Sequence, residues 1–198
     1  AVADGMGGVS GGQIASQTVL QTAESFLRDR FEDSVDPTGL KAILTEMYGR
    51  AQASIREITD KDPSLQGMGT TLTCVLGYDD AFVVGNLGDS RVYYLNEGTL
   101  MQISEDHSYL QEFKNKSGGE DLDPEFVAQY GHIINKTLDG SGDEPDFFPE
   151  EDPVYRLNEQ DGFLLCSDGL IVDKVQDQEQ LFQSYMLGTP DLQTAAES

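Results

Sequence analysis

The stretch GTTLTCVLGYDDAFVVGNLGDSRVYYLNEGTLMQI, residues 69–103, decides the fold class. It contains four short runs rich in β-branched and aromatic residues, which cover Thr70 to Tyr78, Ala81 to Leu87, Val92 to Leu95 and Leu100 to Ile103. Segments with Gly, Asp or Asn separate these runs, a pattern typical of strands joined by tight turns. The stretch therefore predicts an antiparallel meander.

Two helical patterns precede the meander. Apolar residues recur every three or four positions from about Ser10 to Phe31, the spacing of an amphipathic helix. Asp36-Pro37 is a suitable cap and first-turn pair for a second helix, whose apolar residues run from Leu40 to Ile58 and which ends at residues 60–63. We expect these helices to form an antiparallel pair that covers an apolar surface.

Shorter elements follow the meander. The part of the chain from residue 107 to 131 is polar and mixed, with a short helix expected after Asp123-Pro124, and residues 139–153 resemble a loop. Further strands are expected at Val154 to Leu157 and Phe163 to Cys166, and helices at about Gln178–Leu187 and Pro190–Ser198. Neither an internal repeat nor a linker divides the chain, so residues 1–198 are expected to form a single domain.

The composition excludes several classes of function. The 198 residues include 36 Asp and Glu against 12 Lys and Arg, a net charge of −24, so nucleic acids and anionic lipids would be repelled. No apolar run reaches the roughly 18–20 residues of a membrane span. Cys74 and Cys166 each lie in an apolar segment, which argues against a disulfide scaffold. We expect a soluble cytoplasmic protein that binds neither nucleic acid nor membrane.

An acidic stretch lies within the expected loop. Six of the ten residues from Asp143 to Asp152 are acidic and two are proline. This composition favours a solvated mobile loop over a specific binding site.

Two apolar strands end in Asp-Gly, at Asp4-Gly5 and at Asp168-Gly169, and a third runs into Gly88-Asp89-Ser90-Arg91. Carboxylates gathered at buried strand ends repel one another unless protons or cations neutralise them. Oxygen ligands without Cys or His select hard ions such as Mg²⁺ or Mn²⁺. Asp-Gly after a strand is also an ordinary turn, so the pattern leaves both a metal site and simple turns open.

Other catalytic chemistries find less support. The sequence has no Gly-x-x-x-x-Gly-Lys phosphate loop, no Gly-x-Ser-x-Gly elbow and no Arg six residues after Cys166, where Val172 stands,. His107 and His132 are the only histidines, too few for a His-rich zinc site. We expect His132 to be structural and His107, beside Asp106, to support a ligand rather than to be one.

Five motifs together resemble the PPM/PP2C family of metal-dependent Ser/Thr protein phosphatases. In chain order, they are residues 2–8 (VADGMGG), 69–71 (GTT), 88–91 (GDSR), 106–108 (DHS) and 167–169 (SDG). Met6 in the first motif is similar to the bacterial branch, because the eukaryotic enzymes usually have His there. The resemblance spans almost the whole chain.

The resemblance implies an α+β fold, a four-layer α-β-β-α sandwich of two antiparallel sheets flanked by helix pairs. It also implies two Mg²⁺ or Mn²⁺ ions, with Asp4 bridging them, Gly5 offering its carbonyl and Asp168 binding one. Asp106 would share a possible third ion with Asp168. Residues placed beside these ligands, in supporting or structural roles, are Asp89, Ser90, His107, Ser167 and Gly169. Residues 109–130 would be a flap beside the active site, and the segment from His132 to Leu138 resembles the one that follows it.

The implied activity is hydrolysis of phosphoserine and phosphothreonine in phosphorylated proteins by a hydroxide that bridges the two ions. With Met6 in place of His, the leaving oxygen would take its proton from metal-bound water. The family's upstream phosphate-binding Arg and acidic ligand, and a downstream ligand Asp, have no counterpart here, so the 198 residues are expected to be trimmed at both ends. The alternative is a catalytically impaired pseudophosphatase that serves as a binding or regulatory module. An acidic cation buffer is a weaker alternative, because no Ca²⁺ loop is present.

Overall fold

The computed structural model describes residues 1–31, 39–118, 123–150, 155–171 and 178–188. The helices are α1 (Gly8–Arg30), α2 (Leu40–Lys61), α3 (Tyr109–Ser117), α4 (Pro124–Tyr130) and α5 (Gln178–Gly188), with 3₁₀ turns η2 (Pro63–Leu65) and η3 (Asp168–Leu170). The strands are β1 (Gly5–Met6), β2 (Gly69–Thr70), β3 (Leu72–Tyr78), β4 (Ala81–Leu87), β5 (Arg91–Asn96), β6 (Thr99–Gln102), β7 (Asp146–Phe148), β8 (Tyr155–Arg156) and β9 (Gly162–Cys166).

Two antiparallel sheets form the centre of the molecule. In the first, β4 pairs with β3 on one edge and with β7 and β8 on the other. In the second, β5 lies between β6 and β9. The predicted meander is therefore divided, because β4 and β5 follow each other in sequence but lie in different sheets. Gly88, between them, has a φ of 113°, a conformation that favours glycine.

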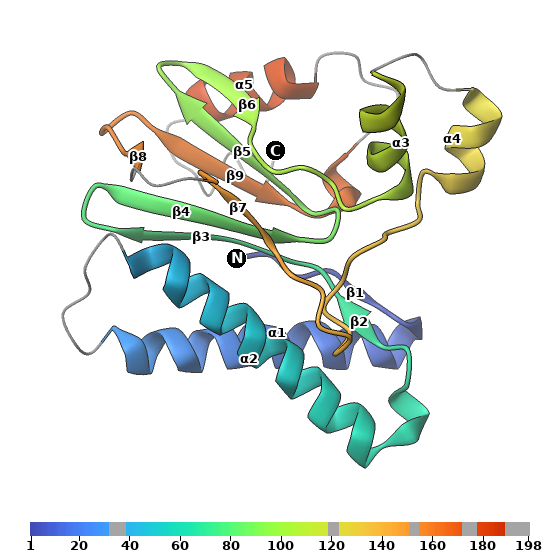
Figure 1. The fold of residues 1–198 in the computed structure, drawn as a ribbon. Helices are drawn as coiled ribbons and strands as arrows, with labels where there is room; N and C mark the ends of the chain where they lie inside the picture. The colour runs from blue at the N-terminus through green and yellow to red at the C-terminus, as the bar shows by residue number, and fades with distance from the viewer. Residues whose placement is uncertain (32–38, 119–122, 151–154, 172–177, 189–198) are drawn as a thin grey trace.

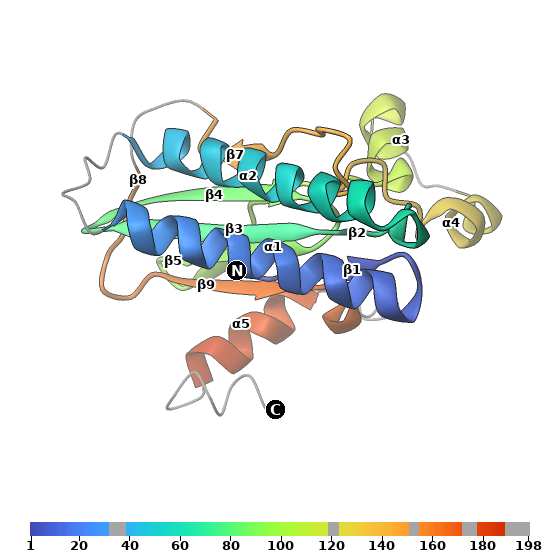
Figure 2. The same ribbon diagram turned by 90° about the horizontal axis from the view of Figure 1, so that it is seen from below.

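The elements stack in layers. Figures 1 and 2 show α1 and α2 side by side against the β3–β4 sheet, with the β5–β6–β9 sheet behind it and α5 beyond. The buried Tyr48 of α2 donates a hydrogen bond of 2.9 Å to the carbonyl oxygen of Leu72. Between the sheets, the rings of Phe82 and Phe163 pack with centroids 4.8 Å apart. On the outer face, Phe182 of α5 packs against Tyr93. Burial of these apolar faces is the main force that holds the layers together.

Most of the expected elements are present. The two long helices, the strands of residues 70–103 and the helix at 178–187 are confirmed as α1, α2, β2 to β6 and α5, and the strand at 163–166 as β9. Of the strand expected at 154–157, Tyr155–Arg156 form β8. The proposed cap at Asp36-Pro37 and the helix at 190–198 lie outside the described residues. Cys74 and Cys166 are free and buried, as expected.

The prediction of a loop over residues 139–153 was wrong at β7. Phe148 pairs with Val84, and Asp146 with Asn86. This short strand therefore forms by pairing with the edge of β4. Its acidic neighbours are also anchored. The Thr137 backbone N–H donates to the Asp143 carboxylate over 3.0 Å, and Lys41 donates to the Glu150 carbonyl over 2.6 Å. A strand that depends on its pairing partner carries little pattern of its own.

No helix within the described residues has the length and apolar character needed to cross a membrane.

Candidate active site

A cavity of about 660 Å³ lies where the strand ends of both sheets meet α3 and α4. Its polar lining comprises Asp4, Thr71, Asp89, Arg91, Asp106, Ser108, His132 and Asp168. Its apolar lining comprises Met6, Leu110, Val127, Ile134 and Ile171. The segments of the predicted strand-end motifs therefore meet in one place, and the expected flap, residues 109–130, supplies the wall through α3 and α4. His132, expected to be structural, lies exposed in this wall.

The backbone of Asp4 is held by two threonines. The Asp4 N–H donates to Thr71 Oγ1 over 2.9 Å, and the Thr71 N–H donates to the Asp4 carbonyl over 2.8 Å. Thr70 Oγ1 donates to the same carbonyl over 2.9 Å. Thr71 Oγ1 also lies 2.8 Å from Ser90 Oγ, so Ser90 is a buried support of this backbone rather than a lining residue. These contacts fix where the Asp4 carboxylate enters the cavity.

The carboxyl groups of Asp4 and Asp168 contact each other. Burial raises the pKa of Asp4, and the charge of Asp168 raises it further, as does a hydrogen bond that protonated Asp4 donates to the Asp168 carboxylate. A hydrogen bond from Ser167 opposes this shift. Two carboxylates this close repel unless a proton or a cation lies between them. Gly169, in η3, is exposed.

Asp89 lies between β4 and β5 and faces the same cluster. Burial, followed by the charge of Asp168 and smaller contributions from Asp106 and Asp4, raises its pKa from 3.8 to about 6. Four carboxylates from separate segments thus act on one another electrostatically. Such a cluster favours bound cations.

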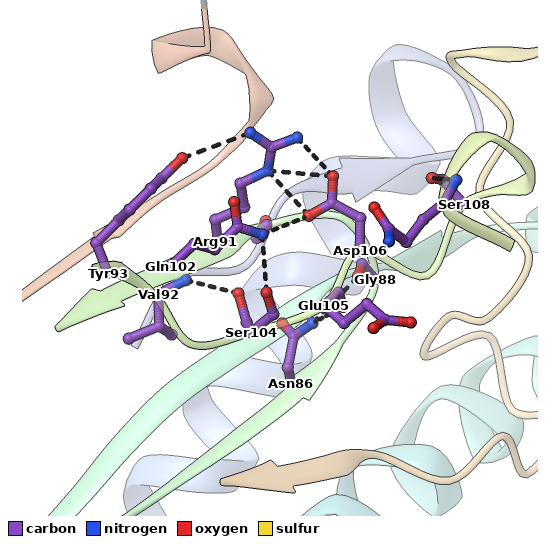
Figure 3. A network of polar contacts seen from close by, with 12 residues as sticks. Asn86, Gly88, Arg91, Val92, Tyr93, Gln102, Ser104, Glu105, Asp106 and Ser108 are labelled. Atoms are coloured by element: carbon purple, nitrogen blue, oxygen red, sulfur yellow. Dashed lines mark hydrogen bonds and ion pairs between the residues drawn. The ribbon is translucent and has the colours of Figure 1, made fainter. Parts of the chain in front are cut away.

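Asp106 is paired with an arginine. Arg91 Nε lies 2.9 Å from Oδ1 and Nη2 lies 2.6 Å from Oδ2 of Asp106. Gln102 Nε2 adds a contact of 3.2 Å to Oδ1, as Figure 3 shows. Asp106 therefore lies at the cavity, as expected for a ligand, but its carboxylate is engaged by protein donors.

His107 is buried behind the cavity. Its ring Nδ1 accepts a hydrogen bond of 3.1 Å from the Gly88 backbone N–H. The His107 backbone N–H in turn donates to the Gly88 carbonyl over 3.0 Å. Because Nδ1 accepts, the ring hydrogen belongs on Nε2, which lies 3.0 Å from Asp146 Oδ2,. The positive φ of Gly88 and a Cβ position only 2.5 Å from Thr71 Cγ2 leave no room for another residue there. His107 therefore supports the turn at Gly88.

Gly5 is required for packing. A Cβ at this position would lie 2.0 Å from the Gly12 carbonyl oxygen in α1. The first turns of α1 therefore pack directly on β1, which fixes the position of the residue after Asp4.

The oxygen donors fit hard divalent ions. Asp4 and Asp168 both line the cavity, and carboxylate oxygens are donors that suit Mg²⁺ or Mn²⁺,. Among the described residues, however, no group of three or more His, Cys, Asp or Glu is arranged to hold an ion. The side chains present therefore fit as part of a coordination sphere, with carbonyl oxygens and water as further donors.

Sequence reasoning missed the roles of Thr71, Arg91 and Asp146. Thr71 and Arg91 lie within the quoted GTT and GDSR motifs, so the signal was present, but only the fold reveals their partners. Asp146 gave no signal, because it stands in the acidic stretch interpreted as a loop.

The paired sheets, the flanking helices and the converging carboxylates are features of an α+β metal-dependent phosphatase. The family model described as Protein phosphatase 2C matches residues 1–195, and the chain belongs to this family, in its bacterial Ser/Thr phosphatase branch. PstP of Mycobacterium tuberculosis is 33% identical over 181 residues. The phosphatase stp of Listeria welshimeri is 32% identical over 173 residues.

Solved structures agree with this assignment. The catalytic domain of PstP in complex with two manganese ions matches with a TM-score of 0.78 and 32% identity, covering 98% of this chain and 76% of that one. Stp1 of Staphylococcus aureus matches with a TM-score of 0.77 and 27% identity, covering 98% and 73%. The sequence matches cover 90% and 85% of this chain but only 32% of PstP and 65% of the Listeria phosphatase.

Proposed function

We propose that this chain is the catalytic domain of a metal-dependent protein phosphatase that hydrolyses phosphoserine and phosphothreonine. The observation that carries the proposal is that Asp4 and Asp168 line one cavity together with Asp89 and Asp106. Membership of the protein phosphatase 2C family supports it. The substrates would be phosphorylated proteins.

Asp4 and Asp168 would hold the ions, two Mg²⁺ or Mn²⁺, with the Gly5 carbonyl as a further oxygen donor. The two manganese ions named for the PstP catalytic domain support this choice. When bound, such ions supply Lewis-acid activation of water and neutralise charge on the phosphoryl oxygens. They would also offset the net charge of −24, which otherwise opposes the approach of a phosphate dianion,.

The chain's own residues prepare this site in two ways. Thr71 and Thr70 fix the Asp4 backbone through three hydrogen bonds, which keeps its carboxylate oriented toward Asp168. The apolar side of the cavity, with Leu110 and Val127 from α3 and α4, limits water around the substrate and strengthens electrostatic interactions there.

The test is hydrolysis of an aryl phosphate and of a phosphothreonine peptide by the full-length protein with Mn²⁺. Asp168→Asn keeps the size of the side chain but removes its charge, and we expect a loss of activity of at least about 100-fold. Asp29→Asn, at an exposed position in α1, is the matched control and should retain full activity. Equal activity of wild type and Asp168→Asn would contradict the proposal.

A pseudophosphatase is the second candidate. It is favoured by the absence of a three-ligand His, Cys, Asp or Glu group among the described residues. In that case the full-length protein would bind phosphopeptide without turnover at any Mn²⁺ concentration. Turnover that requires Mn²⁺ and Asp168 would exclude this alternative.

We further propose that residues 1–198 belong to one four-layer domain and that the protein is cytoplasmic. Cys74 and Cys166 are buried free thiols, as expected in a reducing compartment. Limited proteolysis of the full-length protein would test the domain, since a single domain should give one resistant core that contains residues 1–198.

A further inference from the structure

Both oxygens of the Asp106 carboxylate accept hydrogen bonds from protein donors. Oδ1 accepts hydrogen bonds from Arg91 Nε over 2.9 Å and from Gln102 Nε2 over 3.2 Å. Oδ2 accepts from Arg91 Nη2 over 2.6 Å and from Arg91 Nε over 3.1 Å. An ionised carboxylate offers about four acceptor positions in total. Three N–H groups make the four contacts drawn in Figure 3, because the single hydrogen of Arg91 Nε is shared between Oδ1 and Oδ2.

The donors are held in place independently of Asp106. Arg91 begins β5, and its Nη1 donates to the hydroxyl of Tyr93 over 3.4 Å. Gln102 ends β6, and its Nε2 also donates to the Ser104 carbonyl over 2.8 Å. Because β5 and β6 are paired strands, these two side chains approach Asp106 from a rigid support.

The ion pair is shielded from solvent. The side chains of Arg91 and Asp106 are 25% and 13% exposed, whereas the Arg28–Glu24 pair on α1 is 72% and 68% exposed. A bidentate pair in such surroundings is stronger than a surface pair. Although burial alone lowers the pKa of Arg91, its contacts with Asp106 hold it above the ordinary value, so the guanidinium remains charged.

This arrangement does not fit the role that the family resemblance assigns to Asp106. A divalent ion at its carboxylate would have to compete with these donors and would stand beside a fixed positive charge. We propose that Arg91 is a tethered cation that occupies Asp106, so that a divalent ion binds there only by displacing the guanidinium. The pair would act in this way whether or not Asp4 and Asp168 hold ions for hydrolysis.

The test measures Mn²⁺ binding rather than activity. Full-length wild type, Arg91→Gln, Asp106→Asn and the double variant are titrated with Mn²⁺ and followed by calorimetry and by the electron paramagnetic resonance of free Mn²⁺. We expect Arg91→Gln to gain an additional Mn²⁺ site, or to bind its weakest ion at least about tenfold more tightly, within the usual range of coupling between two sites. The gain should be absent from the double variant, because it requires the Asp106 carboxylate.

Asp106→Asn alone should bind as many ions as wild type, with affinities within about twofold, because a carboxylate engaged by Arg91 contributes no ligand. Arg28→Gln removes the same charge from an exposed helix and serves as the matched control, with no expected gain. Loss of one ion in Asp106→Asn, or no gain in Arg91→Gln, would overturn the proposal.

A second variant covers the case in which Arg91→Gln does not fold. Arg91→Lys keeps the charge but cannot form the bidentate contact, so Mn²⁺ should compete more effectively at Asp106 than in wild type. Affinity unchanged from wild type in Arg91→Lys would count against the tethered cation. If wild type binds no Mn²⁺ at all, the proposed phosphatase function is contradicted, whereas an Asp106-dependent gain in the Arg91 variants would still support the present inference.

Discussion

The carboxyl groups of Asp4 and Asp168 line the same cavity and act on each other electrostatically, although Asp4 precedes β1 and Asp168 follows β9. Burial and the charge of Asp168 raise the pKa of Asp4. The contact is thus unfavourable when both groups are ionised and becomes favourable when a cation neutralises them. Stability and metal binding are therefore coupled at this pair.

Replacing Asp168 with Asn should stabilise the metal-free protein and remove its response to Mn²⁺. Relief of repulsion at pH 7 is expected to contribute about 0.5 kcal/mol, a small value because solvent screens these partly exposed groups. Wild type should gain about 2.7 kcal/mol when Mn²⁺ is at 100 times its dissociation constant. Urea unfolding with EDTA or Mn²⁺ measures both effects, and Asp29→Asn is the control. Equal stabilisation of Asp168→Asn by Mn²⁺ would contradict the pairing.

Asp89 should make the metal-free protein less stable as the pH rises. Its pKa is raised from 3.8 to about 6, so between these values the folded state binds more protons than the unfolded state. Stability from this group is therefore present at low pH and is lost as the pH rises through about 6,. Asp89→Asn should remove this slope and add about 1 kcal/mol at pH 7, a figure reduced for solvent screening.

The measurement is urea unfolding from pH 4 to 7 in EDTA, compared between wild type and Asp89→Asn. The large negative charge of the chain affects both proteins alike, so the difference between them isolates Asp89. Asp60→Asn, at an exposed position of α2, should follow the wild-type curve. A parallel curve for Asp89→Asn would show that Asp89 is not protonated in the folded state.

The fold could be predicted where an element carries its own pattern. The apolar stripe of α2 and the apolar runs of β3 and β4 are readable because α2 buries one face, β3 is largely buried and β4 is buried along its whole length. β7 was missed because it depends on pairing between Phe148 and Val84, which no local pattern encodes. The division of the meander into two sheets was missed for a similar reason, since it depends on the conformation of one residue, Gly88.

For the candidate site, the sequence indicated individual Asp residues but not the side chains that they contact. Asp4, Asp89 and Asp168 follow apolar strands, a position compatible with a shared metal site and with ordinary turns, and the fold shows that they line one cavity. The partner of Asp106 was not predictable. Arg91 lies at the start of β5, 15 residues earlier in the sequence, and only the fold brings its side chain to Asp106. The role of Thr71 likewise depends on its hydrogen bond to the Asp4 backbone.

Thr71 should matter through its hydroxyl oxygen. Thr71→Val keeps the shape but leaves the Asp4 N–H and Ser90 Oγ without their partner, at a cost of about 1–3 kcal/mol in unfolding free energy. Its Mn²⁺ affinity should fall as Asp4 loses orientation. Thr71→Ser keeps the oxygen and should preserve the affinity within a few-fold. Equal Mn²⁺ affinity in the Val and Ser variants would refute the role of the hydroxyl.

The charge of the chain should select basic substrates. With a net charge of −24, the surface attracts phosphosites flanked by Lys or Arg and repels acidic ones. The ratio of kcat/KM for matched basic and acidic phosphopeptides should exceed one and fall as salt rises, because salt screens exposed charges. Stopped assays at about 20 and 300 mM NaCl measure this ratio, and a ratio of one at low salt would contradict the prediction.

Met6 lines the cavity at the position where the eukaryotic relatives usually have His, and it cannot donate a proton. Met6→His should add a general acid, which accelerates substrates with poor leaving groups more than aryl phosphates. Because the imidazole donates only when protonated, the gain should be largest below its pKa and disappear as the pH rises through it. Profiles of kcat from pH 5.5 to 9 with an alkyl and an aryl phosphate measure the effect, and Met6→Leu controls for packing. An unchanged rate and profile in Met6→His would show that proton donation to the leaving oxygen does not limit turnover.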